Sequence, residues 1–326
     1  MEKIITEKKF RFDIPEGKKK ERIDLFLTNS IEHITRTRIQ RLIKENYVRV
    51  NGKPVKTNYK VYPRDIIEVT IPVSPRPAKV LPENIPLNIL YEDQYLIVVN
   101  KPPGMVVHPA LGNYSGTLVN ALLYHTNKLS KLNEEIRMGI VHRIDKDTSG
   151  LLVAAKDEWT HSQLAKQFAS RTIQREYWTV VWGSINEKGE VIGNITRSKR
   201  DRKIFSVSES EGKHAHTIYE RIEKYKFTSL VKVNLMTGRT HQIRVHMVFI
   251  YHPVFGDPTY GGRKIVYGTN IPKIKDKVNS LLKIIPRQAL HAKTLGFIHP
   301  HKKESMVFNS ELPDDMKLLI SELRKE

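Results

Sequence analysis

The residues best suited to chemistry stand in one short loop, His142-Arg143-Ile144-Asp145-Lys146-Asp147-Thr148-Ser149. The loop is dense in charged and hydroxyl groups and is followed by an apolar run, Leu151–Ala155, typical of a buried strand. Loop residues held by a rigid strand are often catalytic. Asp145 and Asp147 could act as general acid and base. The residues alone leave a catalytic loop and a structural loop equally open.

The segments after this loop indicate which elements could position it. Asp157 is the expected N-cap of a helix over Glu158–Ala169, with Leu164 and Phe168 on its inner side. The alternating character of Thr172–Trp182 predicts a strand that crosses a sheet. A strand, a helix and a second strand would thus support the loop.

Composition limits the class of protein. The 326 residues suffice for about two domains, and 39% apolar content fits a folded protein. The lack of cysteine excludes disulfides, thiolate metal sites and cysteine nucleophiles, and fits a reducing compartment. A net charge of +20 favours nucleic acid as partner over a mere solubility surface. Apolar runs too short for a membrane helix and no signal-peptide core predict a cytoplasmic protein without membrane contact.

A proline-rich segment divides the chain. Residues 72–82 contain four prolines, each of which fixes φ and removes a backbone donor. This composition predicts a stiff, extended linker. We therefore expect a small N-terminal domain over residues 1–75, a linker over 76–84 and a larger body over 85–326.

The N-terminal segment predicts basic helices packed on a small sheet. Thr35 is the expected N-cap of a helix over Arg36–Glu45, whose apolar positions share one face. Asn46 suits a left-handed helix end, and Asn51-Gly52 is a strong signal for a two-residue hairpin turn. The other faces of the helix carry four cations: Arg36, Arg38, Arg41 and Lys44.

This segment resembles the S4 RNA-binding domain over residues 20–70. The likeness rests on Arg22-Ile23-Asp24, Thr35-Arg36-Thr37-Arg38, Leu42-Ile43, Val48–Gly52 and Asp65–Val69. Asn46 and Arg64 stand where the family often has glycine. Asparagine tolerates the same backbone, whereas Arg64 could alter its turn. The resemblance implies RNA phosphate contacts, which position RNA without reading its sequence, by Arg36, Arg38, Arg41 and Lys44.

The loop with Asp145 closely resembles the signature of the RluA/RluD family of pseudouridine synthases. His142–Asp145 and Thr148–Leu152 carry the likeness, with isoleucine where the family usually has leucine before the aspartate. Supporting segments follow the family's order and extend the match over nearly all of residues 85–315. They are Asn100–Pro109, Arg175–Tyr177, Thr237–His246 and His252–Asp257. With the N-terminal segment, the chain looks most like the large-ribosomal-subunit members.

The resemblance implies a fold and a reaction. The expected fold class is α+β, with a mixed, mainly antiparallel sheet in the catalytic domain and a small S4-like α/β domain before it. The expected enzyme is an isomerase that converts specific uridines of RNA, expected to be 23S rRNA, into pseudouridine. Neither a metal nor an organic cofactor is expected, and the protein is expected to be a monomer.

The resemblance also assigns roles to residues. Asp145 is the catalytic carboxylate, which adds to the ribose C1′ or assists proton removal from the sugar. Arg244 is the cation that keeps Asp145 charged and oriented. Tyr177 stacks on the target base and assists proton removal from C5. His142 and Arg143 are assigned to the space that the flipped-out uridine leaves in the RNA. Arg239 is assigned as a second cation of the site, with an RNA-binding role. For His142, a plain structural hydrogen bond stays open.

Other sites and functions are weaker. Pairs such as His241 and His246 lack clustered carboxylates to complete a ligand set, so no metal site is predicted. Ser149 near His142 is not in a nucleophile elbow. Lys101 is expected to shape or charge the cleft. Two rival functions remain: a non-catalytic RNA-binding or ribosome-assembly factor, and a carboxylate-dependent glycoside hydrolase with a second acid.

Overall fold

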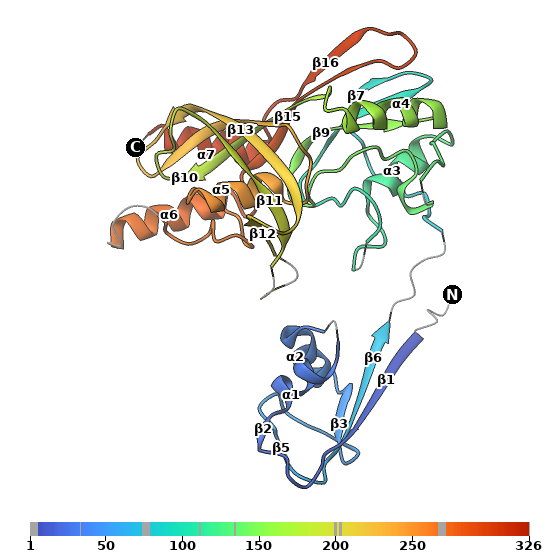
Figure 1. Ribbon diagram of the computed structural model, residues 1–326, viewed down its shortest axis with the longest axis vertical. Coiled ribbons are helices and arrows are strands. Elements are labelled where there is room, and N and C mark those ends of the chain that lie inside the picture. The colour runs from blue at the N-terminus through green and yellow to red at the C-terminus, as the bar shows by residue number, and fades with distance from the viewer. Residues whose placement is uncertain are drawn as a thin grey trace. The chain divides into compact units, whose positions relative to one another are not determined.

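The chain folds into two compact units, Met1–Pro77 and Ala78–Glu326 (Figure 1). The computed structural model describes residues 6–32, 34–73, 79–110, 112–133, 135–198, 201, 204–266 and 272–325. Each unit has its own cluster of buried apolar side chains, as separate domains do. No helix in the described part of the chain is long and apolar enough to cross a membrane.

The N-terminal unit is a small antiparallel sheet that shares one apolar core with two helices. The sheet has the order β1-β6-β3-β4, and β2 pairs separately with β5. The strands are β1 Thr6–Asp13, β2 Glu21–Arg22, β3 Val48–Val50, β4 Lys53–Pro54, β5 Lys60–Val61 and β6 Ile66–Val73. The helices are α1 Ile23–Ser30 and α2 Arg36–Lys44.

The turns of this unit follow from single residues. The Thr35 side chain caps α2 by accepting the Arg38 N–H at 3.3 Å, as predicted. Asn46 ends the helix with φ 61°, and the Asn51-Gly52 turn has φ 51° and 78°, which confirms both predictions. Arg64 adopts φ 70°, in the left-handed region that residues other than glycine rarely occupy. The arginine therefore holds the left-handed backbone that a glycine would take more easily.

The second unit is built on a ten-stranded sheet in the order β12-β11-β13-β14-β10-β15-β9-β8-β7, with β16 paired to β15. Every neighbouring pair is antiparallel except β9 and β15. This is the mixed, mainly antiparallel sheet that we expected. Its strands are β7 Ile89–Glu92, β8 Leu96–Lys101, β9 Ser149–Ala155, β10 Gln174–Trp182, β11 Lys188–Arg197, β12 Phe205–Ser208, β13 Lys213–Lys224, β14 Thr228–Leu235, β15 Leu290–Ile298 and β16 Ser305–Asn309.

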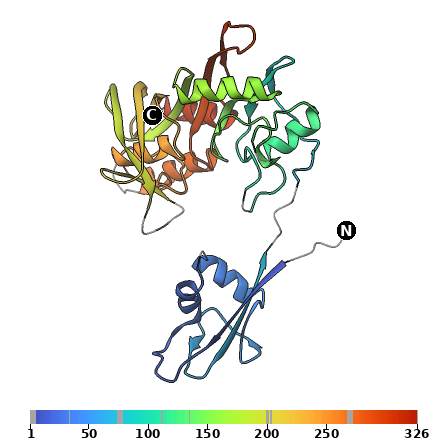
Figure 2. The same cartoon turned by 45° about the vertical axis from the view of Figure 1, so that its right-hand side comes forward.

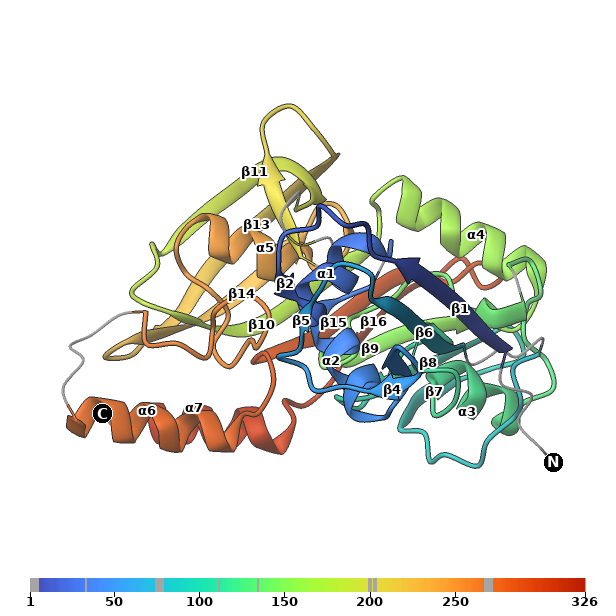
Figure 3. The same ribbon diagram turned by 90° about the horizontal axis from the view of Figure 1, so that it is seen from below.

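Helices cover both faces of this sheet. Alternate residues of β10 enter different clusters: Tyr177 and Val181 pack with α3 and α5, whereas Val180 and Trp182 pack with α6 and α7. Helices α6 and α7 contact each other and overlap in the view of Figure 3, and α4 is the light-green helix in the upper part of Figure 2. The helices are α3 Leu118–His125, a 3₁₀ turn Glu135–Arg137, α4 Glu158–Ala169, α5 Gln242–Phe249, α6 Pro272–Ile284 and α7 Asp314–Leu323.

The elements predicted around the Asp145 loop are present. Strand β9 is buried along its whole length, and Asp157 caps α4 by accepting the Thr160 N–H at 2.8 Å. Strand β10 begins at Gln174, later than predicted, because Arg171 adopts a left-handed φ of 61° after α4 and the chain turns there.

The segment before β7 differs from the expected linker over 76–84. Val80 is buried in the core of the second unit, and the Asn120 side chain donates to the Leu81 carbonyl at 2.7 Å. The Glu83 carboxylate accepts the Gly116 N–H at 3.0 Å. Residues 79–84 therefore belong to the second unit, because its core and its α3 turn bind them. Residues 76–78 lie outside the described residues.

Candidate active site

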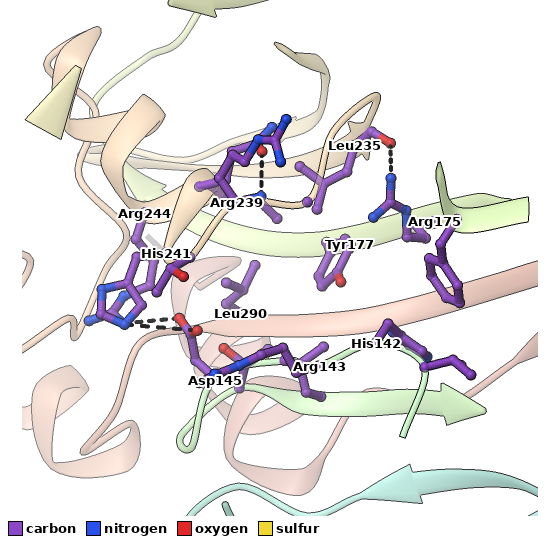
Figure 4. Close-up of a pocket in the computed structure, with 18 of the residues that line it drawn as sticks. His142, Arg143, Asp145, Arg175, Tyr177, Leu235, Arg239, His241, Arg244 and Leu290 are labelled. Carbon is purple, nitrogen blue, oxygen red and sulfur yellow. Dashed lines mark hydrogen bonds and ion pairs between the residues drawn. The ribbon is translucent and has the colours of Figure 1, made fainter. Parts of the chain in front are cut away.

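A pocket of about 370 Å³ lies where three segments meet: the loop before β9, strand β10 and the turn into α5 (Figure 4). Apolar side chains of Leu235, Ile243 and Leu290 form part of its wall. Six predicted site residues line it: His142, Arg143, Asp145, Tyr177, Arg239 and Arg244. The pocket thus joins positions far apart in the sequence and brings their charged and polar side chains together.

Asp145 and Arg244 form the polar centre of the pocket. Arg244 Nη1 donates to Asp145 Oδ2 at 3.0 Å, although the residues are 99 positions apart. The Asp145 side chain is 18% exposed, so one edge of the carboxylate reaches the pocket while the other is held. A carboxylate kept in place by a cation on one side is suited to act on a reactant on the other.

Asp257 holds Arg244 from behind. Arg244 Nε donates to Asp257 Oδ2 at 2.6 Å and Nη2 donates to Oδ1 at 2.9 Å, a two-pronged pair with a fully buried carboxylate. Burial opposes the charge of Arg244, but the bonds to Asp257 and the charges of Asp257 and Asp145 raise its pKa. Sequence reasoning did not assign Asp257 to the site, although His252–Asp257 was among the segments that carried the resemblance.

The turn into α5 aims Arg244 at the loop. His241 stands before the helix with φ 56°, and the Gln242 side chain joins the turn to β13 by donating to the His216 carbonyl at 3.0 Å. Gln242 Oε1 also accepts the Arg239 N–H at 2.9 Å. His241 Nε2 lies 3.9 Å from Asp145 Oδ1, and burial lowers the pKa of this histidine. His241 is a second neighbour of the carboxylate that the sequence did not predict as functional.

Two buried cationic side chains, Lys101 and Arg287, donate to backbone carbonyls in and beside the loop around Asp145. Buried Lys101 donates from Nζ to three carbonyl oxygens, those of Pro102, Met105 and Lys146, at 2.7, 2.8 and 3.0 Å. Burial lowers the pKa of Lys101 to about 7. Arg287 Nη1 donates to the Asp147 carbonyl at 2.9 Å. Lys101 therefore shapes the cleft, as expected, by fixing backbone rather than by facing a ligand.

Gly150 is required where the loop enters β9. Its φ is 118°, and a Cβ there would lie 2.2 Å from the Ala292 carbonyl oxygen of β15. These strands are the parallel pair, so a side chain at this position would push them apart. The close approach of β15 keeps the loop residues just before Gly150 in one place.

Tyr177 offers a ring to the pocket from β10. The residue is 8% exposed, and burial raises the pKa of its phenol to about 12. The hydroxyl is therefore protonated at neutral pH, and the side chain is best suited to stack on a base.

The other predicted residues differ in their surroundings. His142 accepts the Val153 N–H on Nε2 at 3.1 Å and stacks on Phe168, and burial lowers its pKa to about 3. This is the structural hydrogen bond that the sequence left open. Arg143 is exposed at the pocket. Arg239 also lines it and donates from Nε to the His214 carbonyl at 2.9 Å.

Known proteins that resemble the chain decide its family. The RNA pseudouridylate synthase family matches residues 95–248, and the S4 domain matches residues 21–67. The Bacillus subtilis protein named uncharacterized RNA pseudouridine synthase YlyB is 46% identical, over 95% of this chain and 96% of its own. The Zymomonas mobilis ribosomal large subunit pseudouridine synthase D is 46% identical, over 93% of each chain. The chain belongs to the RNA pseudouridine synthase family.

The synthase also shares the fold of a solved relative. The human RNA pseudouridylate synthase domain containing 4 superimposes with a TM-score of 0.55 at 24% identity, over 73% of this chain and 93% of that one. The predicted fold class and the predicted enzyme class, an isomerase that acts on RNA, are confirmed. In the described parts of the synthase, no three histidine, aspartate or glutamate side chains gather as metal ligands.

The four cations predicted on α2 differ in whether a carboxylate is bound to them. Arg36 donates from Nε and Nη2 to Asp24, at 3.0 and 2.9 Å. Burial opposes ionisation of Asp24, but hydrogen bonds from Arg22, Gln40 and Arg36 lower its pKa. Arg41 pairs with Glu45 at 2.7 Å, whereas Arg38 and Lys44 are exposed and bind no carboxylate among the described residues. Arg38 and Lys44 are thus the most available for phosphate.

Replacing Tyr177 separates its ring from its hydroxyl. Tyr177→Ala should weaken the complex with target RNA by about 5- to 150-fold, the value of a stacked base. Tyr177→Phe keeps the ring and should bind normally. Since the phenol pKa is about 12, the rate ratio of Tyr177→Phe to the wild type should not vary with pH below about 10. A ratio that falls as pH rises would show that the phenolate takes part.

Proposed function

We propose that this synthase modifies specific uridines of 23S rRNA, acting in the cytoplasm as a monomer, with Asp145 as its catalytic carboxylate. The catalytic roles proposed for these residues rest on one observation: Asp145 and Arg244 are in contact at 3.0 Å in a pocket that Tyr177 also lines. Relatives named ribosomal large subunit pseudouridine synthase D support the substrate, at 46% identity in Zymomonas mobilis and 40% in Neisseria meningitidis.

Each side chain of the pocket has a separate task. The Asp145 carboxylate adds to C1′ or takes a ribose proton as the N1–C1′ bond breaks. Tyr177 holds the detached uracil by stacking while it turns to present C5. A C5–C1′ bond then forms, C5 loses its proton and N1 gains one, so the product is an isomer. Arg244 keeps one Asp145 oxygen occupied, which leaves the other for the sugar.

RNA binding must offset the cost of extruding the uridine, which is a few kcal/mol. Arg143 and Arg239 line the pocket and can contact the RNA beside the extruded uridine. In the N-terminal unit, Arg38 and Lys44 are exposed cations that can meet phosphates. The excess of 55 basic over 35 acidic residues supports a partner with dense negative charge.

Tritium release tests the reaction directly. Ribosomal RNA labelled with tritium at uridine C5 should lose the label to water when the protein is added, because C5 exchanges its proton for a bond to C1′. Binding without release would favour a non-catalytic RNA-binding factor, and release of free uracil would favour a glycoside hydrolase. The position of the targets is then found by mapping pseudouridines across rRNA with and without the gene. No change in 23S rRNA would refute the proposed substrate.

Affinity for RNA should depend steeply on salt. If six to ten phosphates are contacted, the association constant should fall roughly 10³–10⁵-fold between 50 and 200 mM salt. Lys44→Gln and Arg38→Gln should each lower the slope of log K against log salt by about one. Lys188→Gln is a matched control, since this exposed lysine of β11 already pairs with Glu220. A slope unchanged in Lys44→Gln and Arg38→Gln would remove α2 from the RNA-binding surface.

A further inference from the structure

Arg175 is a largely buried arginine of the catalytic unit whose guanidinium lacks a carboxylate partner among the described residues. Two other arginines with largely buried side chains each have a carboxylate in a two-pronged pair: Arg244 with Asp257, and Arg287 with Asp315. Arg175 pairs with no carboxylate among the described residues. Burial lowers its pKa, and a charge in such surroundings normally has a partner.

The guanidinium of Arg175 is nevertheless held firmly. Nη2 donates to the Leu235 carbonyl at 3.1 Å, and the group lies over the Phe168 ring, 5.7 Å from its centre. Nε is shielded from solvent and has no acceptor in the described structure. A Cβ at Gly238 would lie 2.8 Å from Nη1, so glycine leaves the space that this guanidinium occupies. The cation is therefore fixed in advance, with donors to spare.

Its place in the pocket identifies what it could meet. Arg175 and Tyr177 stand two residues apart on β10 and both line the pocket, while Asp145 lies on the other side of Tyr177 (Figure 4). If the ribose C1′ is at Asp145 and the base is stacked on Tyr177, as proposed above, the far edge of the base points to Arg175. That edge of uracil carries carbonyl oxygens, which accept hydrogen bonds.

We propose that Arg175 donates to a carbonyl oxygen of the target uracil and stabilises the negative charge that this base carries while it is detached. This inference rests on the proposed function. When N1–C1′ breaks, the electron pair stays on the base and spreads over N1 and the two carbonyl oxygens. The charge is returned when C5 bonds to C1′, so no further reactant is needed. Donors that are fixed in a water-poor pocket stabilise such charge most effectively.

If the contacted oxygen is O4, the same hydrogen bond also selects uracil over cytosine. A guanidinium has only donors, so it can bind the O4 of uracil but not the amino group that cytosine carries at this position. A buried donor left facing another donor disfavours the wrong base. With a contact to O4, Arg175 would be both a catalytic residue and a specificity residue.

The test uses the full chain and an oligonucleotide that spans a mapped target uridine. Arg175→Gln should lower the single-turnover rate of pseudouridine formation by about 10²–10³-fold, the usual effect of one lost donor to developing charge. Gly238→Ala should lower it less, by pushing the intact guanidinium aside. Arg263→Gln is the control: this exposed arginine outside the pocket also donates to one carbonyl, that of Leu282, and its loss should change nothing. Melting curves confirm that each variant is folded.

Modified bases then locate the contact. Replacing O4 or O2 of the target by sulfur, a weaker acceptor, should slow the wild type at the contacted position but should not slow Arg175→Gln further. Fluorine at C5 stabilises the base anion, so Arg175→Gln should lose less rate with this substrate. Because C5 then has no proton to lose, the reaction is followed as the disappearance of 5-fluorouridine from the digested nucleosides. Equal sulfur effects in both proteins would overturn the proposal. So would an effect of Arg175→Gln confined to affinity and abolished by an uncharged flanking phosphate, which would indicate a phosphate contact. A wild type that makes no pseudouridine would instead refute the proposed function.

Discussion

Asp145→Asn should abolish pseudouridine formation, lowering the rate by at least about 10⁴-fold, the order of loss when a catalytic group that acts with its neighbours is removed. Asparagine has nearly the same shape and keeps an oxygen that can accept from Arg244 Nη1. It has no negative charge with which to add to C1′ or take a proton. Tritium release measured with excess enzyme reports the chemistry, and a titration of fluorescent RNA reports binding, which should be nearly unchanged.

Asp147→Asn is the matched control. Asp147 is an acid of the same loop and the substitution removes the same charge, but only its backbone carbonyl has a described bond, from Arg287. Its side chain does not line the pocket that holds Tyr177. We expect this variant to retain turnover. Equal activity of the two variants would remove Asp145 from its proposed role.

Asp257→Ala should destabilise the synthase by about 3–5 kcal/mol, the usual cost of leaving one partner of a buried ion pair alone. The Arg244 guanidinium would lose two hydrogen bonds while remaining inside the protein. Asp257 also accepts the Thr259 and Tyr260 N–H groups, at 2.8 and 3.0 Å, so the turn after α5 would loosen too. Urea denaturation measures the stability, and tritium release measures the accompanying loss of activity.

A double variant separates stability from chemistry. Arg244→Met with Asp257→Ala removes both charges, so part of the lost stability should return. Activity should stay low, because nothing then orients Asp145. If Asp257→Ala alone unfolds at the urea concentration of the wild type, the pair contributes little. If the double variant is fully active, Arg244 has no part in catalysis.

Local elements were predictable where one residue decides the backbone. Asp157 and Thr35 cap their helices through their own side chains, and Asn51-Gly52 forms its turn because both residues tolerate positive φ. Arg64 shows the limit of this reasoning. Its backbone takes a φ of 70° although arginine does not favour it, and the Arg64 N–H donates to the Ile14 carbonyl at 2.9 Å, which holds the turn.

The residues of the candidate site could be predicted from the sequence, but the contacts that hold them in place could not. The resemblance named Asp145, Tyr177 and Arg244, which line one pocket. It could not show that Asp257 holds Arg244 or that Lys101 binds three carbonyls, because such contacts depend on how distant segments pack. Tyr177 and Arg175 are separated by one residue in the sequence, yet only the structure shows that Arg175 has no carboxylate partner among the residues that it describes.

The anchoring of residues 79–84 decides how the two halves of this enzyme can be separated. Fragments that start at residue 85 would lose Val80 from an apolar core and leave the Asn120 amide without the Leu81 carbonyl. They would also lose the Glu83 carboxylate that accepts a hydrogen bond from the Gly116 N–H. The catalytic unit should therefore be expressed from Lys79 or earlier. A fragment that starts later could lose activity because its own core is damaged, and this loss would wrongly suggest that catalysis requires the N-terminal unit.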